Sequence, residues 1–213
     1  MTAGVPLEVR VWGDFACFTR PEMKVERVTY PVMTPSAARG VLEAIFWKPE
    51  FVWRVEEIRV LKEIRYFSIV RSEVKSRTSQ RVAAGWGRDG GGFYADDDRT
   101  QRHTLALRDV DYVIRARMEL NEHAGADPAK YRDQFRRRVS GGRCFAIPYL
   151  GCREFGAYFA PPDGKTPIEH TEDLGRMLLD IDYAVDGSGR RAPRFFDARL
   201  ERGVLKVPQR EEE

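Results

Sequence analysis

The clearest pattern of hydrophobic and polar positions lies in residues 24–49, and the rest of the chain is organised around it. Residues 24–31 have an extended character, after which Thr34 supplies an N-cap and Pro35 occupies a favoured first helical position. Apolar side chains then recur at three- and four-residue spacing, which gives a helix one buried face. We expect this helix to end at Pro49 and to bury Ala38, Val41, Leu42, Ile45 and Phe46.

Strand patterns flank this helix on both sides. Residues 7–19 begin with an alternation that is typical of a half-buried strand. Residues 51–74 are β-rich and are expected to form a hairpin that turns near Lys62 and Glu63. Residues 105–120 place one arginine pair, Arg115 and Arg117, opposite an apolar face formed by Val110, Tyr112, Ile114, Ala116 and Met118.

A second helix is predicted from Asp127 and Pro128 to the pair Gly141 and Gly142. Its apolar positions are Tyr131, Phe135 and Val139, whereas its other side is strongly basic. A glycine-rich turn within residues 141–159 then leads into a strand. Glycine permits positive φ and a close approach of backbone to a ligand, and amide donors in such a turn are able to hold phosphate.

The order strand, helix, strands, helix, strand predicts an α+β fold with the ferredoxin-like (RRM-like) βαββαβ plan. Residues 1–160 would form this domain, with residues 75–101 inserted as a loop that lacks sustained periodicity. A Pro/Gly linker (161–167) would separate it from a small C-terminal β-sheet appendage, residues 161–213, which contains a hairpin near Gly203. A structureless segment of this length is usually functional or disordered.

Composition changes this picture mainly through arginine. The 213 residues are 42% hydrophobic with a net charge of only +3, but 29 of the 36 cationic side chains are arginines and seven are lysines. Arginine suits bidentate contacts with phosphate and stacking on bases. A GC-rich genome produces the same enrichment, so composition alone leaves both explanations open.

Cysteine usage and hydropathy indicate a soluble cytoplasmic protein. The three cysteines are odd in number and show no CxxC spacing, which argues against a disulfide framework and a zinc site. No apolar run approaches the ~20 residues of a membrane span, and the amino terminus lacks the apolar core of a signal peptide. No cofactor is predicted.

The inserted loop is the first candidate for nucleic-acid contact. Five glycines and five cations surround Trp86, Phe93 and Tyr94 in residues 75–101, a combination that suits phosphate pairing and base stacking with a single strand. A floppy insertion explains the same composition. Asp96, Asp97 and Asp98 are consecutive and have no supporting ligand cluster, so a solvated loop is favoured over a metal site.

Three segments together carry a resemblance to a known family. FTRPEMKVERVTYPVMTPSAARGVLEAIFWKP (18–49), LRDVDYVIRA (107–116) and RCFAIPYLGCREFGAYF (143–159) resemble the CRISPR-associated Cas-five family, Dvulg subtype, of the RAMP superfamily, which serves type I-C systems. The resemblance spans nearly the whole chain. It implies a ferredoxin-like domain with a glycine-rich loop, here residues 141–151, followed by a carboxy-terminal β domain.

The resemblance also implies an activity and partners. It implies cleavage of precursor CRISPR RNA within the repeat hairpin, without a metal, by attack of a 2′-OH that leaves a 2′,3′-cyclic phosphate. The protein would then stay on the 5′ handle together with other subunits of the type I-C interference complex. Such chemistry needs a base, cations for the phosphorane charge and an acid for the leaving oxygen.

Relatives in this family use an aromatic hydroxyl at the end of the first helix together with Lys and His on a later strand. The corresponding positions here are Phe46 on the helix and Arg115 and Arg117 on the strand. Arginine stabilises charge but is a poor base because its pKa stays above ~12, so His103, before the same strand, is the candidate base; His123 and His170 are less favourable. The predicted RNA contacts are Arg20, Lys24, Arg27, Lys48, Arg136, Arg137, Gly141, Gly142 and Arg143.

Two further readings remain open beside the nuclease. One is a non-catalytic scaffold subunit that grips the 5′ handle through Arg115, Arg117 and the loops. The other is nonspecific binding of duplex DNA by the arginine-rich surface, which is compatible with either and would show strong salt dependence with little sequence preference.

Overall fold

The computed structural model describes residues 5–125, 127–183 and 191–209. Its helices are α1 (Pro35–Ile45), α2 (Gln80–Asp89), the 3₁₀ helix η1 (Ala95–Asp98) and α3 (Pro128–Ser140). Its strands are β1 (Leu7–Ala16), β2 (Arg27–Val28), β3 (Phe51–Val60), β4 (Tyr66–Val74), β5 (Arg99–Leu120), β6 (Tyr158–Ala160), β7 (Glu172–Tyr183), β8 (Arg191–Glu201) and β9 (Val204–Lys206).

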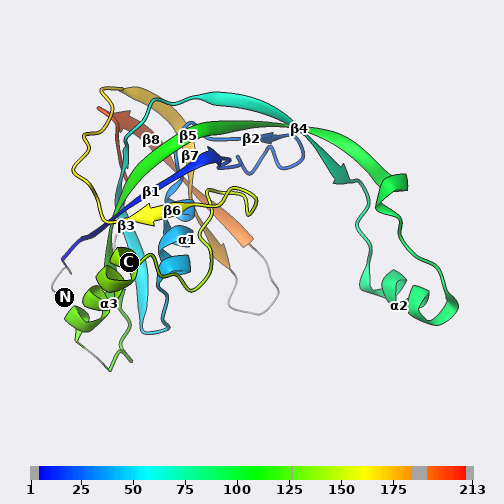
Figure 1. The fold of residues 1–213 in the computed structure, drawn as a ribbon, viewed down its shortest axis with the longest axis horizontal. Helices are drawn as coiled ribbons and strands as arrows, with labels where there is room; N and C mark the ends of the chain where they lie inside the picture. Colours follow the sequence, from blue (N-terminus) through cyan, green and yellow to red (C-terminus); the bar gives the residue numbers. More distant parts are fainter. Residues whose placement is uncertain (1–4, 126, 184–190, 210–213) are drawn as a thin grey trace.

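One curled sheet contains all the strands of the described residues, and β5 is its spine (Figure 1). Along the main path the strand order is β6-β1-β5-β3-β9-β8-β7, while β2 and β4 pair with the first half of β5. All neighbours are antiparallel except β2, which runs parallel to β5. The fold is therefore a mixed α/β structure built around an antiparallel sheet.

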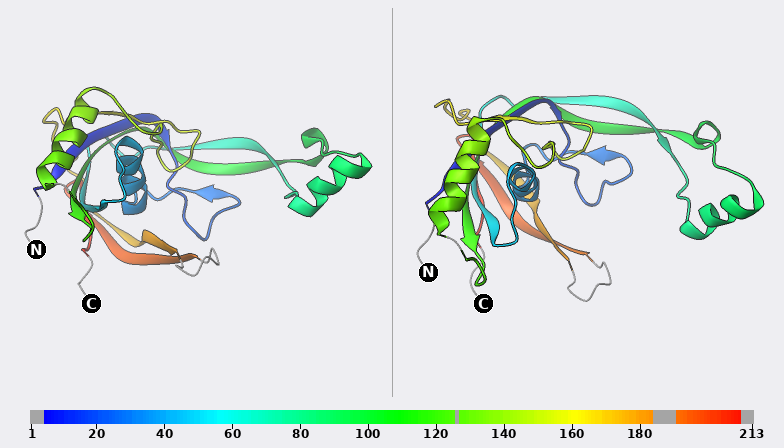
Figure 2. Two further views of the ribbon diagram at one scale, coloured as in Figure 1. Left: turned by 90° about the horizontal axis from the view of Figure 1, so that it is seen from below. Right: turned by 60° about the horizontal axis from the view of Figure 1, so that its bottom comes forward.

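Helices α1 and α3 lie against one side of this sheet (Figure 2). The main core lies between these helices and the sheet. The predicted apolar face of α1 is confirmed, since its core-facing residues from Ala38 to Ile45 and the following Phe46 are buried. The predicted apolar face of α3 is also buried at Tyr131, Phe135 and Val139. Thr34 Oγ1 accepts from the Ala37 amide at 3.3 Å, which confirms the N-cap.

The predicted end of the first helix was wrong by several residues. α1 ends at Ile45 because Phe46 adopts extended backbone angles, φ −153° and ψ 112°, while its amide still donates to the Leu42 carbonyl. Pro49 lies in the following connection. The helix thus ends four residues before Pro49, so the proline is not what ends it.

The predicted hairpin within residues 51–74 was also wrong. Two strands are present, but they pair with successive parts of β5 and not with each other: Phe51 lies opposite Leu120, and Tyr66 lies opposite Leu107. The bend between them carries the chain from one half of the long strand to the other. β5 begins at Arg99 because β4 pairs with its first residues.

The first half of β5 and β4 extend as a ribbon away from the body, with α2 and η1 at its tip (Figure 1). The prediction that residues 75–101 lack regular structure was therefore wrong. Ser79 caps α2 by accepting from the Val82 amide at 3.3 Å. No residue of α2 is buried, so this helix depends on its cap and on local contacts.

The predicted C-terminal strands are present and continue the main sheet. β8 and β9 form the hairpin expected near Gly203, and β9 pairs with β3. β7 completes this part of the sheet and packs against α1. Within the described part of the chain, no helix has the length and apolar character that crossing a membrane requires.

Candidate functional site

The two faces of β5 differ in character, as its alternation predicted. Tyr112, Ile114 and Ala116 are buried against the helices. Arg115 and Arg117 project from the opposite side, where their side chains are 39% and 31% exposed. We call the opposite side the open face; its charged residues include Glu8, Arg10, Arg54, Glu56, Glu57, Arg59, Asp111, Arg115, Arg117 and Glu119.

A single carboxylate lies between the two predicted catalytic arginines. A bulge in β3 leaves Glu56 without a partner in the ladder, and its oxygens lie 3.6 Å from Arg115 Nε and 3.4 Å from Arg117 Nη1. Arg117 Nη2 also donates to Gln209 Oε1 at 3.5 Å. The two guanidiniums therefore share one negative charge, and the pair keeps a net positive charge for an anion.

The other cations of the open face are matched by acids. Arg10 donates to both oxygens of the buried Asp111, at 2.9 and 2.6 Å, and this hydrogen bonding raises the pKa of Arg10. Arg59 lies 3.0 Å from Glu8 and 2.5 Å from Glu57. Most charges of this face are thus used to hold neighbouring strands together.

Phe46 lies on the other side of the sheet from the arginine pair. It is 1% exposed, and its ring packs 5.4 Å from that of Phe51. The Arg138 guanidinium lies 5.4 Å from the ring centroid, and Trp53 Nε1 donates to the Phe46 carbonyl at 2.9 Å. The structure therefore places Phe46 in the core and does not bring it to the arginines.

His103 is also remote from the arginine pair. It lies within β5 opposite Val70 of β4, and its amide donates to the Glu26 carboxylate. It lies twelve positions before Arg115 in β5, a path of roughly 40 Å along an extended strand. The structure does not bring His103 together with Arg115 and Arg117.

Another histidine lies near the end of β5 that carries Arg117. His123 follows three positions after Leu120, the last residue of β5, and its Nε2 lies 3.1 Å from the Pro49 carbonyl oxygen. Asn121 Nδ2 donates to the same oxygen at 2.7 Å. These contacts hold His123 against the connection that contains Lys48. His123 was less favoured as the base because it sits in a turn after the strand; its contact with Pro49 joins residues 74 positions apart and is not visible in the sequence.

The three predicted RNA contacts in the loop of residues 18–27 differ in whether an acidic side chain already faces them. Arg20 packs over the Tyr30 ring at 4.4 Å and lies 3.9 Å from Glu22. Arg27 faces Glu73 at 3.6 Å and Glu154 at 3.5 Å. Lys24 is exposed and has no acidic partner among the residues that the structure describes. Of the three, Lys24 is the most available to a phosphate.

The glycines after α3 cap the helix. The amides of Gly141, Gly142 and Arg143 donate to carbonyls of α3 at 3.0, 3.2 and 2.9 Å, and Gly142 has a φ of +61°. This is the geometry in which glycine ends a helix. The proposed phosphate cradle of amide donors is therefore not present at these residues.

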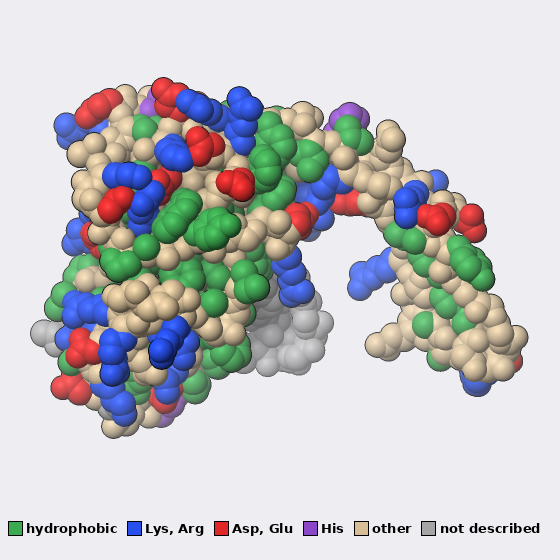
Figure 3. Space-filling view, in the orientation of Figure 1, with side chains coloured by type: hydrophobic (Ala, Val, Ile, Leu, Met, Phe, Trp, Pro, Cys, Tyr) green, Lys and Arg blue, Asp and Glu red, His purple; other side chains and the backbone are tan. Residues whose placement is uncertain are grey.

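The side chains around this cap do form a basic surface with exposed apolar residues. Figure 3 shows Lys and Arg side chains gathered over α3. Arg136 pairs with Asp133 at 3.4 Å, but Arg132, Arg137 and Arg143 have no acidic partner within the described ranges. Phe145 and Ile147 follow, 81% and 78% exposed. We call Arg132, Arg137, Arg143, Phe145 and Ile147 the α3–loop surface.

The loop of this surface is fixed to the body. The amides of Phe145 and Ala146 both donate to the Ala44 carbonyl at the end of α1, at 2.8 and 3.0 Å. Unpaired arginines next to exposed aromatic side chains are the combination that binds single-stranded nucleic acid, through phosphate pairing and base stacking. Sequence analysis predicted Arg137 and Arg143 but not the apolar residues.

The tip of the ribbon also contains a cavity, of about 480 Å³, lined by Arg77, Trp86, Phe93, Tyr94 and Asp97 among others. Asp98 accepts from the Ser76 amide at 2.6 Å, and Asp96 lies 2.7 Å from Arg99. The tip thus combines aromatic and polar groups away from the body. Over the described ranges, no group of three His, Cys, Asp or Glu side chains is placed to hold a metal ion.

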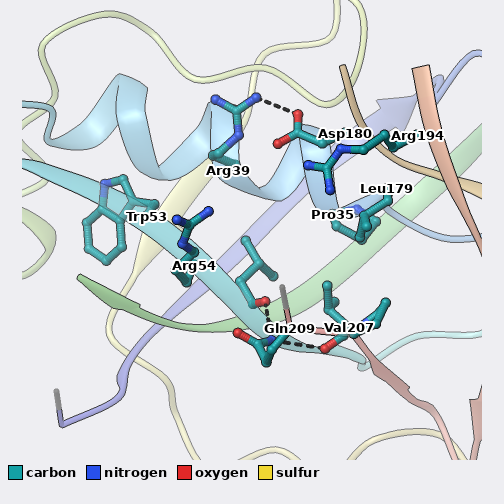
Figure 4. A pocket seen from close by; sticks show the side chains of 11 residues that line it. Pro35, Arg39, Trp53, Arg54, Leu179, Asp180, Arg194, Val207 and Gln209 are labelled. Carbon is teal, nitrogen blue, oxygen red and sulfur yellow. Dashed lines mark hydrogen bonds and ion pairs between the residues drawn. The ribbon is translucent and has the colours of Figure 1, made fainter. Parts of the chain in front are cut away.

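A smaller cavity of about 60 Å³ lies between α1, β3 and the β7–β8 pair (Figure 4). Arg39, Arg54 and Arg194 line it. Arg39 donates to Glu43 at 2.8 Å and to Asp180 at 2.7 Å, so its charge is compensated. This cavity could not be predicted from the sequence because its lining comes from five separate stretches, residues 35–39, 53–55, 179–180, 194 and 207–209.

Comparisons with known proteins agree over nearly the whole length of the chain. The family model described as CRISPR-associated protein (Cas_Cas5) matches residues 6–208. A protein from Thermus thermophilus, named CRISPR pre-crRNA endoribonuclease Cas5d, is 45% identical, with 95% of this chain and 91% of that protein covered. One of the same name from Mannheimia succiniciproducens is 44% identical, with 95% and 94% covered.

Solved structures share the fold. The crystal structure of a CRISPR-associated protein has a TM-score of 0.70 at 22% identity, with 98% of this chain and 94% of that chain covered. A functionally uncharacterized protein from Streptococcus mutans has a TM-score of 0.69 at 20% identity, with 98% and 95% covered. A chain of a CRISPR RNA-guided surveillance complex has a TM-score of 0.53 at 12% identity, with 96% and 91% covered.

Proposed function

The chain belongs to the CRISPR-associated protein (Cas_Cas5) family, and from this premise we propose that it is an endoribonuclease that cleaves precursor CRISPR RNA within the repeat. After cleavage it stays bound to the 5′ handle in a type I-C interference complex, in the cytoplasm. The observation that carries this proposal is the alignment of two pre-crRNA endoribonucleases with 95% of the chain at 45% and 44% identity.

The proposed reaction needs no metal. A base takes the proton of the 2′-OH, O2′ attacks the adjacent phosphorus, and the bond to the 5′ oxygen breaks. The 5′ oxygen takes a proton from an acid and leaves as a 5′-OH, and the other product ends in a 2′,3′-cyclic phosphate. Negative charge develops on the phosphoryl oxygens, where fixed cations contribute most. Arg115 and Arg117 are the proposed cations, and Glu56 holds both guanidiniums in place.

We propose His123, and not His103, as the proton-transfer group. His123 lies at the same end of β5 as Arg117, whereas His103 lies in the outer half of the strand. If Nε2 donates to the Pro49 carbonyl, Nδ1 is left as an acceptor for the proton of the 2′-OH. Lys48, on the same connection, is a further proposed phosphate contact.

The α3–loop surface is the proposed grip on RNA. Arg137 and Arg143 have no acidic partner among the described residues and so offer their charge to phosphates, while Phe145 offers an exposed ring for stacking. Arg20, Lys24, Arg27 and Arg136 extend this grip as secondary contacts. The tip of the ribbon, which carries Trp86 and Tyr94, is a third proposed RNA contact beside the α3–loop surface and the loop of residues 18–27.

The ferredoxin-like assignment is likewise proposed for residues 1–160. The order β6-β1-β5-β3 supports it, because these four strands and the connecting α1 and α3 follow the βαββαβ plan. Residues 161–213 would then be the carboxy-terminal β unit, joined through β9. The ribbon that contains residues 75–101 is an insertion between the second and third strands of that plan.

A second candidate function is a scaffold that binds the 5′ handle without cutting it. The observation that favours it is the burial of Phe46, which also lacks a hydroxyl. Nonspecific duplex DNA binding is compatible with either function. It would be recognised by a strong salt dependence and little sequence preference.

The deciding experiment is incubation of the purified full chain with its cognate repeat RNA in EDTA. A matched RNA would carry one 2′-deoxy sugar at the cut. We expect cleavage in EDTA that the deoxy substitution abolishes. Tight binding without cleavage, in EDTA or with Mg²⁺, would overturn the nuclease and leave the scaffold.

Three histidine variants then test the proton-transfer group. His123→Ala should lower the cleavage rate about a hundredfold, in the range of general acid–base catalysis. His103→Ala and His170→Ala should retain the rate of the unmodified protein. A large loss in His103→Ala alone would reverse this assignment.

A further inference from the structure

Two of the three cysteines meet where the loop of residues 148–156 packs on the end of β1. Cys17 directly follows β1 and Cys152 lies in the loop; both are buried, whereas Cys144 is exposed. The Cys17 amide donates to the Leu150 carbonyl at 3.0 Å, and Cys152 Sγ lies 3.6 Å from the Cys17 carbonyl oxygen. The two residues are therefore neighbours although 135 positions separate them.

Gly151 makes this close packing possible. Its φ is +84°, and a Cβ at this position would lie 2.1 Å from the Cys17 carbonyl oxygen. A side chain is excluded at that distance, so only glycine allows the loop to approach β1 this closely. The meeting of the two thiols is thus fixed by the backbone of the loop.

Charged groups surround the Cys152 sulfur. Arg27 Nη1 donates to Cys152 Sγ at 3.2 Å, and Arg27 also faces Glu73 and Glu154. Arg71 pairs with both of these carboxylates. A guanidinium in direct contact favours the thiolate over the thiol.

The two thiols differ in the direction of their pKa shifts. The hydrogen bond from Cys17, and then the charge and hydrogen bond of Arg27, lower the pKa of Cys152 to about 6 against the opposing effects of burial and Glu154. The same hydrogen bond, and then burial, raise the pKa of Cys17. These directions, together with the contact of Arg27 with Cys152 Sγ, favour the thiolate at Cys152 and the thiol at Cys17.

We propose that Cys152 and Cys17 form a peroxide-reactive dithiol in which Cys152 attacks the oxidant and Cys17 resolves the product as a disulfide. The Cys152 thiolate attacks one oxygen of hydrogen peroxide, an S–O bond forms, the O–O bond breaks, and hydroxide leaves. Cys17 sulfur then attacks the sulfenic sulfur, the S–S bond forms, the S–O bond breaks, and the leaving hydroxide takes the Cys17 proton as water. The two sulfurs together lose two electrons, which the peroxide gains. Redox-responsive cysteines combine a low pKa, a neighbouring resolving thiol and access to the oxidant; Cys152 keeps 7% of its surface exposed and Cys17 none, which suits Cys152 as the attacking residue.

The reaction would change the contact between the loop of residues 148–156 and the end of β1. The disulfide would tie the loop of residues 148–156 covalently to the end of β1. It would also remove the thiolate from Arg27, which would then face only Glu73 and Glu154. Arg27 is a proposed RNA contact, so the oxidation state would alter the charge balance next to bound RNA.

The test treats the folded full chain with limiting hydrogen peroxide and maps the products by mass spectrometry. The unmodified protein and Cys144→Ser should both lose two hydrogens, yield a peptide that links Cys17 to Cys152, and recover on reduction. Cys152→Ser should form no such link. Cys17→Ser should stop at a sulfenic acid on Cys152, seen as one added oxygen that a dimedone probe captures.

The pH dependence gives a second readout that does not rely on the cysteine variants. The rate of oxidation should rise with pH through a midpoint below that of an ordinary thiol, because the pKa of Cys152 is lowered, and Arg27→Gln should shift this midpoint upward because it removes the cation beside the sulfur. Oxidation confined to Cys144 in the unmodified protein, or a product without the Cys17–Cys152 link, would overturn the proposal.

Discussion

The open face of the sheet and the α3–loop surface are both rich in arginine, yet they use it differently. On the open face, Arg10, Arg54 and Arg59 each face a carboxylate, and Arg115 and Arg117 share one. On the α3–loop surface, Arg132, Arg137 and Arg143 have no acidic partner in the described part of the chain. Arginine content therefore says little about RNA binding until the acidic partners are known.

The difference has a physical basis in what surrounds each guanidinium. Strand neighbours on the open face are fixed by the ladder, so opposite charges face each other and stabilise the sheet. Arg137 is exposed in the last turn of α3, where cations are favoured by the helix dipole, and Arg143 is exposed just after the helix. The fully paired Arg10, Arg54 and Arg59 should therefore govern folding stability, whereas the α3–loop surface should govern affinity for RNA; Arg115 and Arg117, which share one carboxylate, lie between these two cases.

The largest effect should follow from breaking the buried ion pair of the open face. Asp111→Ala leaves the Arg10 guanidinium without its bidentate partner and should lower the free energy of unfolding by about 3 kcal/mol. Urea denaturation measures this change. Asp133→Ala, which removes an exposed pair on α3, is the matched control and should leave the midpoint unchanged. Equal midpoints for both variants would contradict a structural role of the open face.

A smaller effect, on the affinity for RNA alone, should follow from removing two arginines of the α3–loop surface. The double variant Arg137→Ala/Arg143→Ala should weaken binding of repeat RNA about tenfold, and the slope of log affinity against log salt should fall by about 1.4. Its thermal unfolding should match that of the unmodified protein. Filter binding at several salt concentrations measures both quantities.

The control for that variant is Arg199→Ala/Arg202→Ala, which removes the same charge from the β8–β9 hairpin. It should change neither the affinity nor the slope by a comparable amount. If the two double variants weaken binding equally, the contribution of the α3–loop surface is only its net charge.

Glu56→Gln is expected to raise the affinity for RNA a few-fold. The neutral amide removes the charge that Arg115 and Arg117 share, so their phosphate contacts should strengthen and RNA affinity should rise about threefold, with a steeper salt slope. Glu201→Gln, which removes an exposed partner of Arg199, is the control. An unchanged affinity would mean that RNA does not reach the arginine pair.

Local signals made part of this molecule predictable. The starts of α1 and α3 were predictable from Thr34 with Pro35 and from Asp127 with Pro128, because helix capping depends on residues only a few positions apart. The alternation around Arg115 and Arg117 revealed which face they occupy for the same reason. These features require no knowledge of what the segment packs against.

Distant contacts account for what the sequence analysis missed. The β3 bulge that places Glu56 between two arginines depends on the register of β3 against β5. The contact of His123 with Pro49 depends on how the ends of α1 and β5 meet. The supposed hairpin of residues 51–74 failed similarly, because the bend at Lys62 does not show that both strands pair with β5.

The smallest effect is expected at the ribbon tip, which tests whether the α3–loop surface is sufficient for binding. Replacing residues 76–98 by a short Gly-Ser turn removes α2 and η1, which bury no residue, so the free energy of unfolding should stay nearly constant. RNA affinity should fall less than in Arg137→Ala/Arg143→Ala, since the tip lies away from the body (Figure 1). Urea denaturation and filter binding measure these changes. A larger loss of affinity than in that variant would identify the tip, with Trp86 and Tyr94, as the main RNA contact, because aromatic stacking would then outweigh the unpaired arginines.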